Sequence, residues 1–464
     1  MTPSIPTSLP AIVIGAGISG LTCAHTLRQR GIHAHVFEAS RHAGGVIRSE
    51  QRDGFLFELG PQSFTFTDSL RQLCRELRIE NQIQPAPEKL PRYLLLDGQL
   101  LRAPLSPPAF FLSPLFSART KWSVVRDALG TTKPPVSPNA GDESIANFVR
   151  RKFGAELLEK LVGPFVSGIY AGDPEKLGLR SAFPQLYNAE NSRGSVVRGL
   201  LRGKKAGPRT LASFAGGNDV LTDALAASLG AALHLDAAVT RVAQSPHWAP
   251  GRFVVEFATS AESEAGATIY TDHLIVATAA PAAGKLLAEL DAKFTPLFEA
   301  MPYVPIAVVS LGYRREAVKN SLQGFGFLAP RTSGLRTLGC VWNSSLFPDR
   351  APQDSVLLTS FVGGAFDTGA PQLPPQELQN IVHQELRRVL GISEMPVIAN
   401  VQIWPQAIPQ YDPAHFRRGI TCSQKVAGFP GLALAGNYLD GPAIGTVVDR
   451  ARKLADYVLD GPPR

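Results

Sequence analysis

The fold is decided by residues 11–49, AIVIGAGISGLTCAHTLRQRGIHAHVFEASRHAGGVIRS. An apolar run over 11–14 stops at a glycine-rich turn, a helical stretch follows over 21–30, and a second apolar run ends in Glu38. This order of strand, glycine turn, helix and strand is typical of the βαβ unit that binds a dinucleotide. The sequence therefore predicts an α/β nucleotide-binding domain.

The glycines of the turn have the spacing that a dinucleotide site requires. Gly15 allows a tight turn, Gly17 lets the backbone approach a pyrophosphate, and Gly20 lets the helix pack closely against the strand. The N-terminus of the helix offers unpaired N–H groups to the phosphates. Glu38 follows 18 residues after Gly20, where an acidic side chain accepts hydrogen bonds from ribose hydroxyls.

Residues 41–49, RHAGGVIRS, indicate which dinucleotide is expected. Gly44 and Gly45 stand where a nicotinamide dehydrogenase normally runs on into its next helix. The alternative is a simple tight turn, because glycine adopts positive φ at little cost. The segment resembles the flavin amine oxidase superfamily, in which an arginine and paired glycines lie beside FAD. This resemblance favours FAD over NAD.

Composition and charge exclude several classes of protein. The 464 residues carry 46 Lys and Arg against 39 Asp and Glu, a net charge of +7, with no long block of like charge. Nucleic acid is therefore not expected as a partner. The four cysteines are widely spaced and predict no metal site. We expect no leader peptide and no membrane-spanning segment, and hence a cytoplasmic location.

The pattern of apolar runs predicts an α/β fold with a Rossmann-like FAD-binding domain built from discontinuous segments. Strands are expected near 238–243, 252–258, 272–278 and 432–437, and helices near 220–229 and 446–459. The predicted FAD-binding segments are residues 1–90, 206–284 and 426–464. Residues 91–205 are assigned to a helical membrane-associating and substrate-access region, and residues 285–425 to a mixed-sheet substrate-binding domain.

Six segments carry a narrower resemblance. They are GAGISGLTCAHTL (15–27), FELGPQSF (57–64), PFVSGIYAGDPEKLGLRSAFP (164–184), GFGFLAP (324–330), SSLFPDRAP (344–352) and LAGNYLDGPAIG (434–445). Together they resemble the protoporphyrinogen oxidase family, the oxygen-dependent FAD enzymes of haem synthesis, along essentially the whole chain. Residues 164–184 are the most specific, since amine oxidases and carotenoid desaturases lack this segment.

The resemblance implies one non-covalent FAD per chain and a set of contacts to it. Those to the phosphates and ribose are Gly15, Ala16, Gly17, Ile18, Ser19, Gly20, Glu38 and Ala39. Those along the cofactor and near the isoalloxazine are Arg41, Gly44, Gly45, Val46, Gly60, Pro61, Gln62 and Ser63. The remaining contacts are Val239 at the adenine, Asn437, Pro442, Ala443 and Ile444. Val239 fits an ordinary core valine equally well.

The substrate that the resemblance implies is a porphyrinogen, a large apolar macrocycle with propionate groups on one edge. Such a molecule needs apolar walls and at least one cation. Arg92 matches the family arginine that pairs with a propionate, and the planar fork of a guanidinium suits a carboxylate. The alternative for Arg92 is a surface arginine that precedes a strand.

Five more residues are implied to contact the substrate. Gly168 and Ala171 lie in a segment whose backbone approaches the macrocycle, where a larger side chain would collide with the ring. Phe325, Phe327 and Trp342 lie in the region of the apolar walls, although buried aromatic residues are more often part of the core.

No side chain stands out as a general base. A hydride can pass from a bridging carbon of the macrocycle directly to flavin N5, while protons leave through the macrocycle's own nitrogens. No catalytic side chain is therefore predicted. His25, His33, His35 and His42 are close in sequence, but no carboxylate or cysteine completes a ligand set, so we expect structural roles.

Residues 104–122, PLSPPAFFLSPLFSARTKW, indicate peripheral contact with the cytoplasmic face of a membrane. An apolar cluster with basic flanks suits insertion into one leaflet. The cluster is Phe110, Phe111, Leu112, Leu115 and Phe116, and the flanks are Arg102, Arg119 and Lys121. The alternative is a loop that folds onto the protein's own core. A homodimer is left open.

The function predicted from these features is oxidation of protoporphyrinogen IX to protoporphyrin IX, a loss of six electrons in three flavin cycles that each convert oxygen to hydrogen peroxide. The first alternative is coproporphyrinogen III, whose four propionates would favour extra cations. Arg48, Arg52 and Arg71 are available, but residues 64–68 contribute none. An amine oxidase, a carotenoid desaturase-like flavoenzyme and a non-catalytic FAD-binding scaffold are further alternatives. Cys422 lies outside the C-terminal flavin motif, which argues against covalent flavin.

Overall fold

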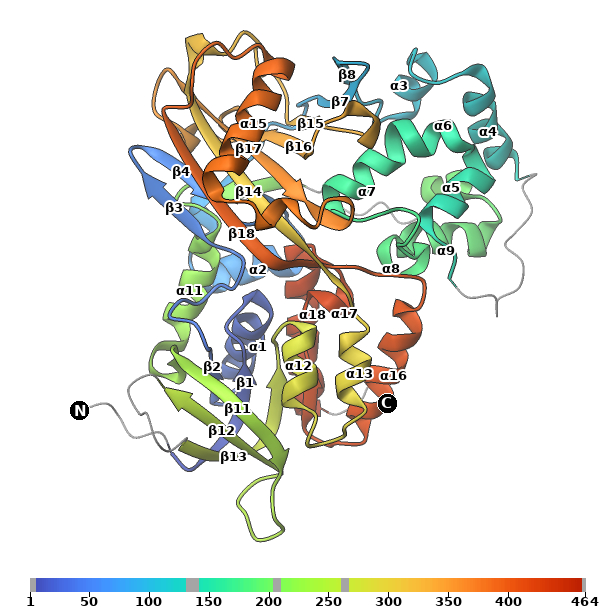
Figure 1. Ribbon diagram of the computed structural model, residues 1–464. Helices are drawn as coiled ribbons and strands as arrows, with labels where there is room; N and C mark the ends of the chain where they lie inside the picture. Colours follow the sequence, from blue (N-terminus) through green and yellow to red (C-terminus); the bar gives the residue numbers. More distant parts are fainter. Residues whose placement is uncertain (1–5, 131–141, 203–209, 260–266, 461–464) are drawn as a thin grey trace.

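A computed structural model describes residues 6–130, 142–202, 210–259 and 267–460 (Figure 1). One seven-stranded sheet has the strand order β10-β2-β1-β13-β12-β11, with β19 also paired to β13. Five of its strands lie side by side and pair in parallel. They are β10 (Leu233–His234), β2 (Ala34–Phe37), β1 (Ser8–Ile14), β13 (Ala267–Val276) and β19 (Leu432–Leu434). The antiparallel strands are β12 (Phe253–Thr259) and β11 (Ala237–Gln244).

The part of β1 over 11–14 is wholly apolar because helices or further strands cover both faces of the sheet there. In β1, Val13 packs into one core cluster and Ile12 into the other, and both are fully buried. The first cluster is covered by helices α1 (Ile18–Gln29), α2 (Asp68–Glu76), α11 (Asp219–Leu229) and α18 (Ile444–Asp460). The second includes α12 (Ala280–Leu286), α13 (Phe294–Glu299) and α16 (His415–Ala427). The Rossmann-like α/β fold is confirmed.

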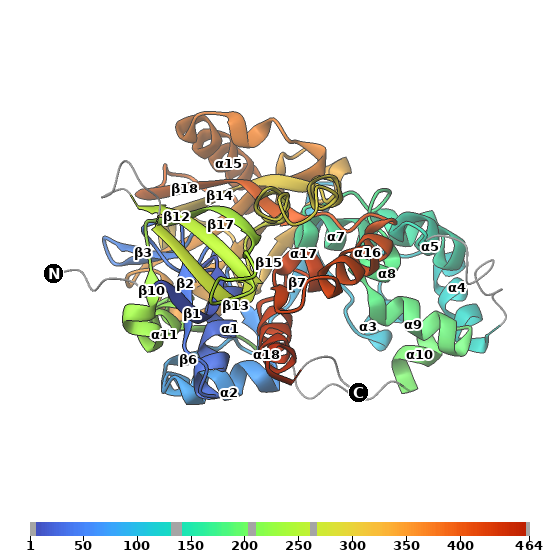
Figure 2. The ribbon, with the colours of Figure 1, turned by 90° about the horizontal axis from the view of Figure 1, so that it is seen from below.

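A second seven-stranded sheet lies beside the first (Figures 1 and 2). Its order is β18 (Ile398–Pro409), β14 (Tyr303–Arg314), β17 (Ser355–Gly363), β16 (Thr337–Trp342), β15 (Gly326–Leu328), β7 (Arg92–Leu96) and β8 (Gln99–Arg102). Helix α15 (Pro375–Leu390) packs on one face, which we call the α15 face, through Leu378, Val382 and Leu386. We call the other face the open face.

The hairpin β7–β8 differs from the assignment of residues 91–205 to a helical region. Arg92–Leu96 and Gln99–Arg102 form an antiparallel hairpin, and β7 pairs in parallel with β15. The turn between them is Asp97-Gly98, and both residues have positive φ. Asp-Gly between apolar runs is a strong signal for a two-residue hairpin turn, because this turn needs positive φ at both positions.

The described residues of 107–202 are mostly helical and form a separate core cluster with Leu94 of β7. Its helices are α3 (Pro107–Leu112), α4 (Ala118–Leu129), α5 (Ile145–Phe153), α6 (Ala155–Leu157), α7 (Gly163–Tyr170), α8 (Leu179–Ala182), α9 (Pro184–Arg193) and α10 (Val196–Arg202). They lie together at one side of the molecule in both views (Figures 1 and 2). Among the helices that the structure describes, none is both long and apolar enough to cross a membrane.

Short elements connect the two sheets. A hairpin of β3 (Ser49–Arg52) and β4 (Phe55–Glu58) precedes a three-stranded sheet of β5 (Phe64–Thr65), β9 (Leu211–Phe214) and β6 (Ile83–Pro85). Helix α14 (Asn343–Leu346) directly follows β16, and α17 (Asn437–Asp440) lies between β19 and α18. These elements bring residues 58–65 close to both sheets.

Candidate active site

The turn between β1 and α1 requires its glycines for steric reasons. Gly15 has φ +103°, and a Cβ there would lie 2.9 Å from the carbonyl oxygen of Ala277. A Cβ on Gly20 would lie 2.0 Å from the carbonyl oxygen of Gly15. Gly17 differs, because a Cβ there would meet nothing within 4 Å. The first two glycines therefore serve packing, whereas the backbone at Gly17 borders open space.

The N-terminus of α1 and Glu38 lie at this turn. No side chain caps the helix at Gly17, and its first turn contains no acidic residue. One carboxylate oxygen of Glu38 accepts a hydrogen bond from the Ala16 N–H at 2.7 Å, and the other accepts one from the Ser40 N–H at 2.9 Å. Glu38 is half-buried. The carboxylate is thus held beside the turn, as an acid that contacts ribose requires.

Two further loops approach the same turn. The Gly44 N–H donates to the Ala16 carbonyl oxygen at 2.8 Å, and a Cβ on Gly45 would lie 3.3 Å from the Gly17 Cα. A Cβ on Gly60 would lie only 2.0 Å from the Val46 carbonyl oxygen. The three predicted contact segments 15–20, 44–46 and 60–63 are therefore contiguous in space.

The C-terminal segment completes this group. A Cβ on Gly445 would lie 2.8 Å from the Thr65 carbonyl oxygen, so the start of α18 packs directly after residues 60–63. The Tyr411 hydroxyl donates to the Asn437 carbonyl oxygen at 2.6 Å. Ile444 is buried, whereas Ala443 is exposed and Pro442 is half-buried. The structure thus brings all of residues 437–444 to the same region.

The residues predicted at the adenine end are less enclosed. The Ala237 N–H donates to the Glu38 carbonyl oxygen at 2.8 Å, which places half-buried Val239 two residues further along β11. The register of β11 against β12 shifts after Val239. Ala39 is exposed, and the Arg41 side chain is 79% exposed, with its nearest carboxylate oxygen, on Asp236, 4.0 Å away.

These residues fit FAD. An uncapped helix N-terminus, open space beside Gly17 and a carboxylate at Glu38 supply groups for the pyrophosphate and ribose. Segments 44–46, 60–63 and 437–444 would hold the flavin half. Cys422 is buried in α16, and burial raises the pKa of its thiol to about 12. This supports non-covalent flavin.

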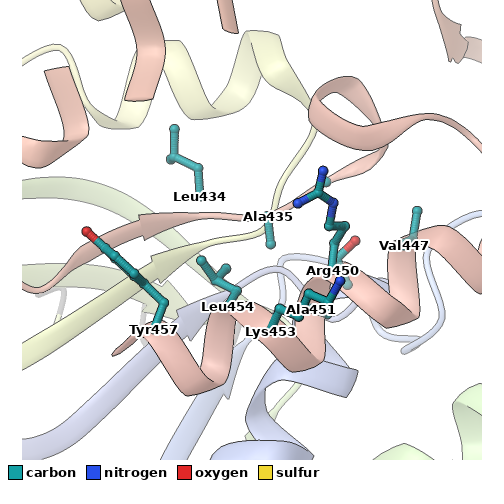
Figure 3. Close-up of a pocket in the computed structure, with 10 residues that line it drawn as sticks. Leu434, Ala435, Val447, Arg450, Ala451, Lys453, Leu454 and Tyr457 are labelled. Carbon is teal, nitrogen blue, oxygen red and sulfur yellow. The ribbon is translucent and has the colours of Figure 1, made fainter. Parts of the chain in front are cut away.

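A cavity of about 330 Å³ adjoins the turn on the side of α18 (Figure 3). Figure 3 shows Arg450, Leu454 and Tyr457 on the helix, with Leu434 and Ala435 at the end of the neighbouring strand. The other lining residues are Ser19, Gly436, Val447, Ala451 and Lys453. Ser19 belongs to the first turn of α1, so the cavity borders the predicted phosphate contacts.

Arg92 lies on the open face of the second sheet. In the parallel pairing, Arg92 is opposite Gly326, and Tyr93 is opposite Phe327, so Arg92 and Tyr93 point to opposite faces. The Arg92 guanidinium stacks over the Phe325 ring at 4.9 Å. Partial burial lowers its pKa, although an arginine remains charged. Among the described residues, no carboxylate pairs with it.

The three aromatic residues that were predicted to line the substrate site lie on different faces of the second sheet. Phe325 is half-buried beside Arg92, as expected. Phe327 and Trp342 instead belong to the core on the α15 face, where they are 3% and 1% exposed. The register of β15 sets this outcome, because Phe327 shares the face of Tyr93 and Cys340. The structure does not bring these two residues together with Arg92.

Gly168 and Ala171 lie on α7 and at its end, beside the same sheet. A Cβ on Gly168 would lie 2.4 Å from a methyl group of Leu328, so the small residue accommodates this leucine. Ala171 is buried with φ +47°, which is unusual for a residue other than glycine, and packs with Ile306 and Val308. Both positions thus hold α7 against the open face. Whether they contact a macrocycle stays a prediction.

A buried polar network beside residues 60–63 was not predicted. Glu58 and Arg350 form an ion pair at 3.1 Å, and both side chains are fully buried. Burial raises the pKa of Glu58 to about 7, despite the opposing effect of Arg350. Both residues lie in quoted motifs, FELGPQSF and SSLFPDRAP, but only the fold shows that the motifs meet. Within the described residues no group of His, Cys, Asp or Glu could hold a metal ion.

Comparison with known proteins defines the class. Residues 18–459 match the family of flavin containing amine oxidoreductases. The chain belongs to this family, and it is therefore a flavoprotein oxidoreductase that uses FAD.

Particular relatives narrow the class. The chain is 32% identical to the chloroplastic protoporphyrinogen oxidase of Oryza sativa, over 99% of this chain and 89% of the relative. It is 29% identical to the coproporphyrinogen III oxidase of Bacillus subtilis, over 97% of each chain. A solved structure of a candidate protoporphyrinogen oxidase from Exiguobacterium sp. superposes with a TM-score of 0.79 at 21% identity, covering 97% of this chain and 98% of that one. The predicted resemblance to the protoporphyrinogen oxidase family is confirmed.

Proposed function

We propose that this flavoenzyme oxidises protoporphyrinogen IX to protoporphyrin IX with oxygen as the acceptor. The observation that carries the proposal is Arg92, a half-buried cation without a carboxylate partner among the described residues, on the open face of the second sheet. A buried cation of this kind is costly unless an anion pairs with it. A propionate of the substrate supplies that anion through two parallel hydrogen bonds.

The surroundings of Arg92 suit an apolar macrocycle. Leu94 and Leu328 share its face of the sheet, and Val308 continues the apolar surface near Ala171. FAD, when bound, accepts a hydride from a carbon of the substrate. The residues of this chain would orient the macrocycle and exclude water, and no protein base is required.

Protoporphyrinogen is favoured over coproporphyrinogen because few cations are free. The Arg52 guanidinium donates to the Ala399 carbonyl oxygen at 2.6 Å and lies 3.3 Å from a carboxylate oxygen of Glu50. Arg71 lies on α2, which packs in the first core cluster and not on the second sheet. Of the cations named from the sequence, only Arg48 then remains to join Arg92. Two propionates match this supply better than four.

Steady-state turnover tests the oxygen chemistry. Removal of six electrons from one porphyrinogen requires three molecules of oxygen and yields three of hydrogen peroxide. We expect this ratio when oxygen uptake, peroxide and porphyrin fluorescence are measured together. Porphyrin formation without peroxide would show that another acceptor is used.

We also propose that the enzyme lies at the cytoplasmic face of a membrane through α3 and α4. The predicted apolar cluster divides: Phe110, Leu115 and Phe116 are buried, whereas Phe111 and Leu112 are 41% and 84% exposed. Exposed Leu105 and Trp122 extend the surface. Exposed basic residues Arg102 and Arg119 flank it. Apolar side chains with basic neighbours suit the interface of an anionic bilayer.

A further inference from the structure

We propose that five buried polar residues form a clamp that positions loop 59–63 against the flavin. The residues of this loop clamp are Glu58, Gln62, Asn218, Asn343 and Arg350, and each is at most 6% exposed. They come from β4, the loop itself, the start of α11, α14 and the segment after α14. The inference rests on the assignment of FAD and is independent of which porphyrinogen is used.

Two clamp residues, Gln62 and Asn218, and the neighbouring Trp404 hold the backbone carbonyl groups of the loop. The Gln62 side-chain amide donates to the carbonyl oxygens of Glu58 at 3.0 Å and Gly60 at 2.9 Å. The Trp404 indole donates to the Leu59 carbonyl oxygen at 2.7 Å, and the Asn218 amide donates to that of Pro61 at 2.7 Å. Four consecutive carbonyl groups, 58–61, therefore each accept a hydrogen bond from a side chain. A loop held in this way has little freedom to shift.

The Glu58 carboxylate anchors the clamp to the FAD-binding domain. One of its oxygens accepts from the Asn218 N–H at 3.0 Å and from Arg350 at 3.1 Å, and the other accepts from the Ser49 hydroxyl at 2.7 Å. The same Arg350 nitrogen also donates to the Ser213 hydroxyl. Burying an ion pair is seldom the most stabilising choice, since apolar residues of similar volume often serve better. The hydrogen bonds of Glu58 and Arg350 are directional, and they point to a role of this ion pair in placing the loop.

Asn343 connects the loop to the sheet that carries Arg92. Its side-chain amide donates to the Gln62 side-chain oxygen at 2.7 Å. Asn343 directly follows β16, which pairs with β15, which in turn pairs with β7 and Arg92. A rigid path thus joins the proposed propionate partner to the loop beside the isoalloxazine. The clamp therefore sets the position of the substrate sheet relative to the flavin.

The substitution Asn343→Ala tests the clamp in the full-length holoenzyme. It removes the Asn343–Gln62 hydrogen bond, and one buried hydrogen bond corresponds to about a tenfold change in an equilibrium constant. We expect the Kd for FAD to rise about tenfold and the flavin absorption maxima to shift. We also expect kcat to fall at least about tenfold. The KM for porphyrinogen should stay unchanged, because Arg92 is intact.

Tyr313→Phe is the matched control. The Tyr313 hydroxyl hydrogen-bonds to His383 at 3.0 Å in the core of the same sheet, on the α15 face. Its loss should lower the thermal midpoint comparably and leave the FAD Kd and spectrum unchanged. If Asn343→Ala does not fold, Gln62→Glu replaces it, because that change removes the two amide donors inside the loop.

If the variant that folds, Asn343→Ala or Gln62→Glu, has the FAD affinity and flavin spectrum of the wild type, the inference is wrong. The polar network then has a purely structural role. The FAD titration needs no substrate. If the proposed function is wrong, the wild type will show no porphyrinogen turnover. The FAD titration and the flavin spectra of the variants still test the role of the loop clamp in that case.

Discussion

At the scale of single residues, the proposed substrate site depends on the direction of the Arg92 side chain. Strand alternation places Arg92 opposite to Tyr93, whose ring packs against Trp342 in the core at 5.4 Å. The charge is thereby kept out of the core and on the open face. Arginine at this strand position cannot serve as a packing residue for the α15 face.

We predict that Arg92→Ala raises KM for protoporphyrinogen about 10- to 100-fold, with FAD still bound. The reason is the loss of one charged hydrogen-bonding contact, worth about 1.5–3 kcal/mol. Steady-state kinetics and the flavin spectrum check this. Arg388→Ala is the control, because Arg388 is exposed on α15 at the opposite face of the sheet. An unchanged KM in Arg92→Ala would remove Arg92 from the site.

The sequence indicated some of these residues and not others. The residues 15–20 and Glu38 could be predicted, because their roles depend on local spacing in one βαβ unit. Phe327 and Trp342 could not be distinguished from wall residues, because their face depends on pairing with β7, which lies more than 200 residues away in sequence. The Glu58–Arg350 pair has the same origin, since it joins positions separated by 292 residues.

At the scale of elements, helix α1 can begin close to β1 only because Gly20 lacks a Cβ. We predict that Gly20→Ala destabilises the protein by about 3 kcal/mol or prevents folding, because the added Cβ would overlap the Gly15 carbonyl oxygen at 2.0 Å. Gly419→Ala in α16 is the matched control, since a Cβ there meets nothing within 4 Å. It should be neutral or stabilise by up to about 1 kcal/mol. Equal thermal midpoints would refute this packing.

The Glu58 carboxyl at the end of β4 makes stability depend on pH. Burial raises its pKa from 4.5 to about 7 in the folded protein, with Arg350, Ser49, Asn218 and Asp219 as its charged and polar neighbours. The folded state then binds more protons than the unfolded state between these values. Stability from this group is therefore full below about pH 4.5 and is lost as the pH rises through about 7.

We predict that this loss amounts to at most about 3 kcal/mol, at 1.36 kcal/mol per pKa unit. Glu58→Gln should flatten the decline. Denaturant unfolding of both proteins at several pH values between about 4.5 and 7 measures it. The same slope in the wild type and in Glu58→Gln would show that another group titrates.

Element prediction succeeded where the signal was local and periodic. The strand expected at 238–243 is Ala237–Gln244, and the helix expected at 446–459 is Ile444–Asp460. The β7–β8 hairpin was wrongly assigned to a helical region because most of the residues that follow it are helical. The Asp97-Gly98 turn was the available signal.

At the scale of the whole molecule, the helices α3 and α4, which carry exposed Phe111, Leu112 and Trp122, lie at one side (Figures 1 and 2). We predict that Trp122→Asp, on α4, lowers affinity for vesicles of phosphatidylcholine and phosphatidylglycerol at least about tenfold, because burial of one large apolar side chain contributes about 1.5–3 kcal/mol. Trp248→Asp is the control, since Trp248 is 79% exposed and lies between β11 and β12 in sequence, two strands that are far from α4 in Figure 1. Equal loss in both variants, or in neither, would contradict the proposed membrane face.

The assembly of the first sheet from distant segments could be predicted because three of its strands contain apolar runs, at 11–14, 274–276 and 432–434. Strands within 8–37, 233–276 and 432–434 indeed lie in one sheet. The relation of the two sheets could not be predicted, because it depends on polar contacts such as Asn343–Gln62 that have no periodic signature.

Oxidation of a porphyrinogen by the flavin is measured directly by anaerobic mixing of the FAD-loaded protein with protoporphyrinogen IX, and separately with coproporphyrinogen III, while flavin absorbance is followed. We predict rapid bleaching by protoporphyrinogen IX and slow or no bleaching by coproporphyrinogen III. Bleaching by coproporphyrinogen III alone would contradict the proposed substrate, and bleaching by neither would contradict porphyrinogen oxidation itself.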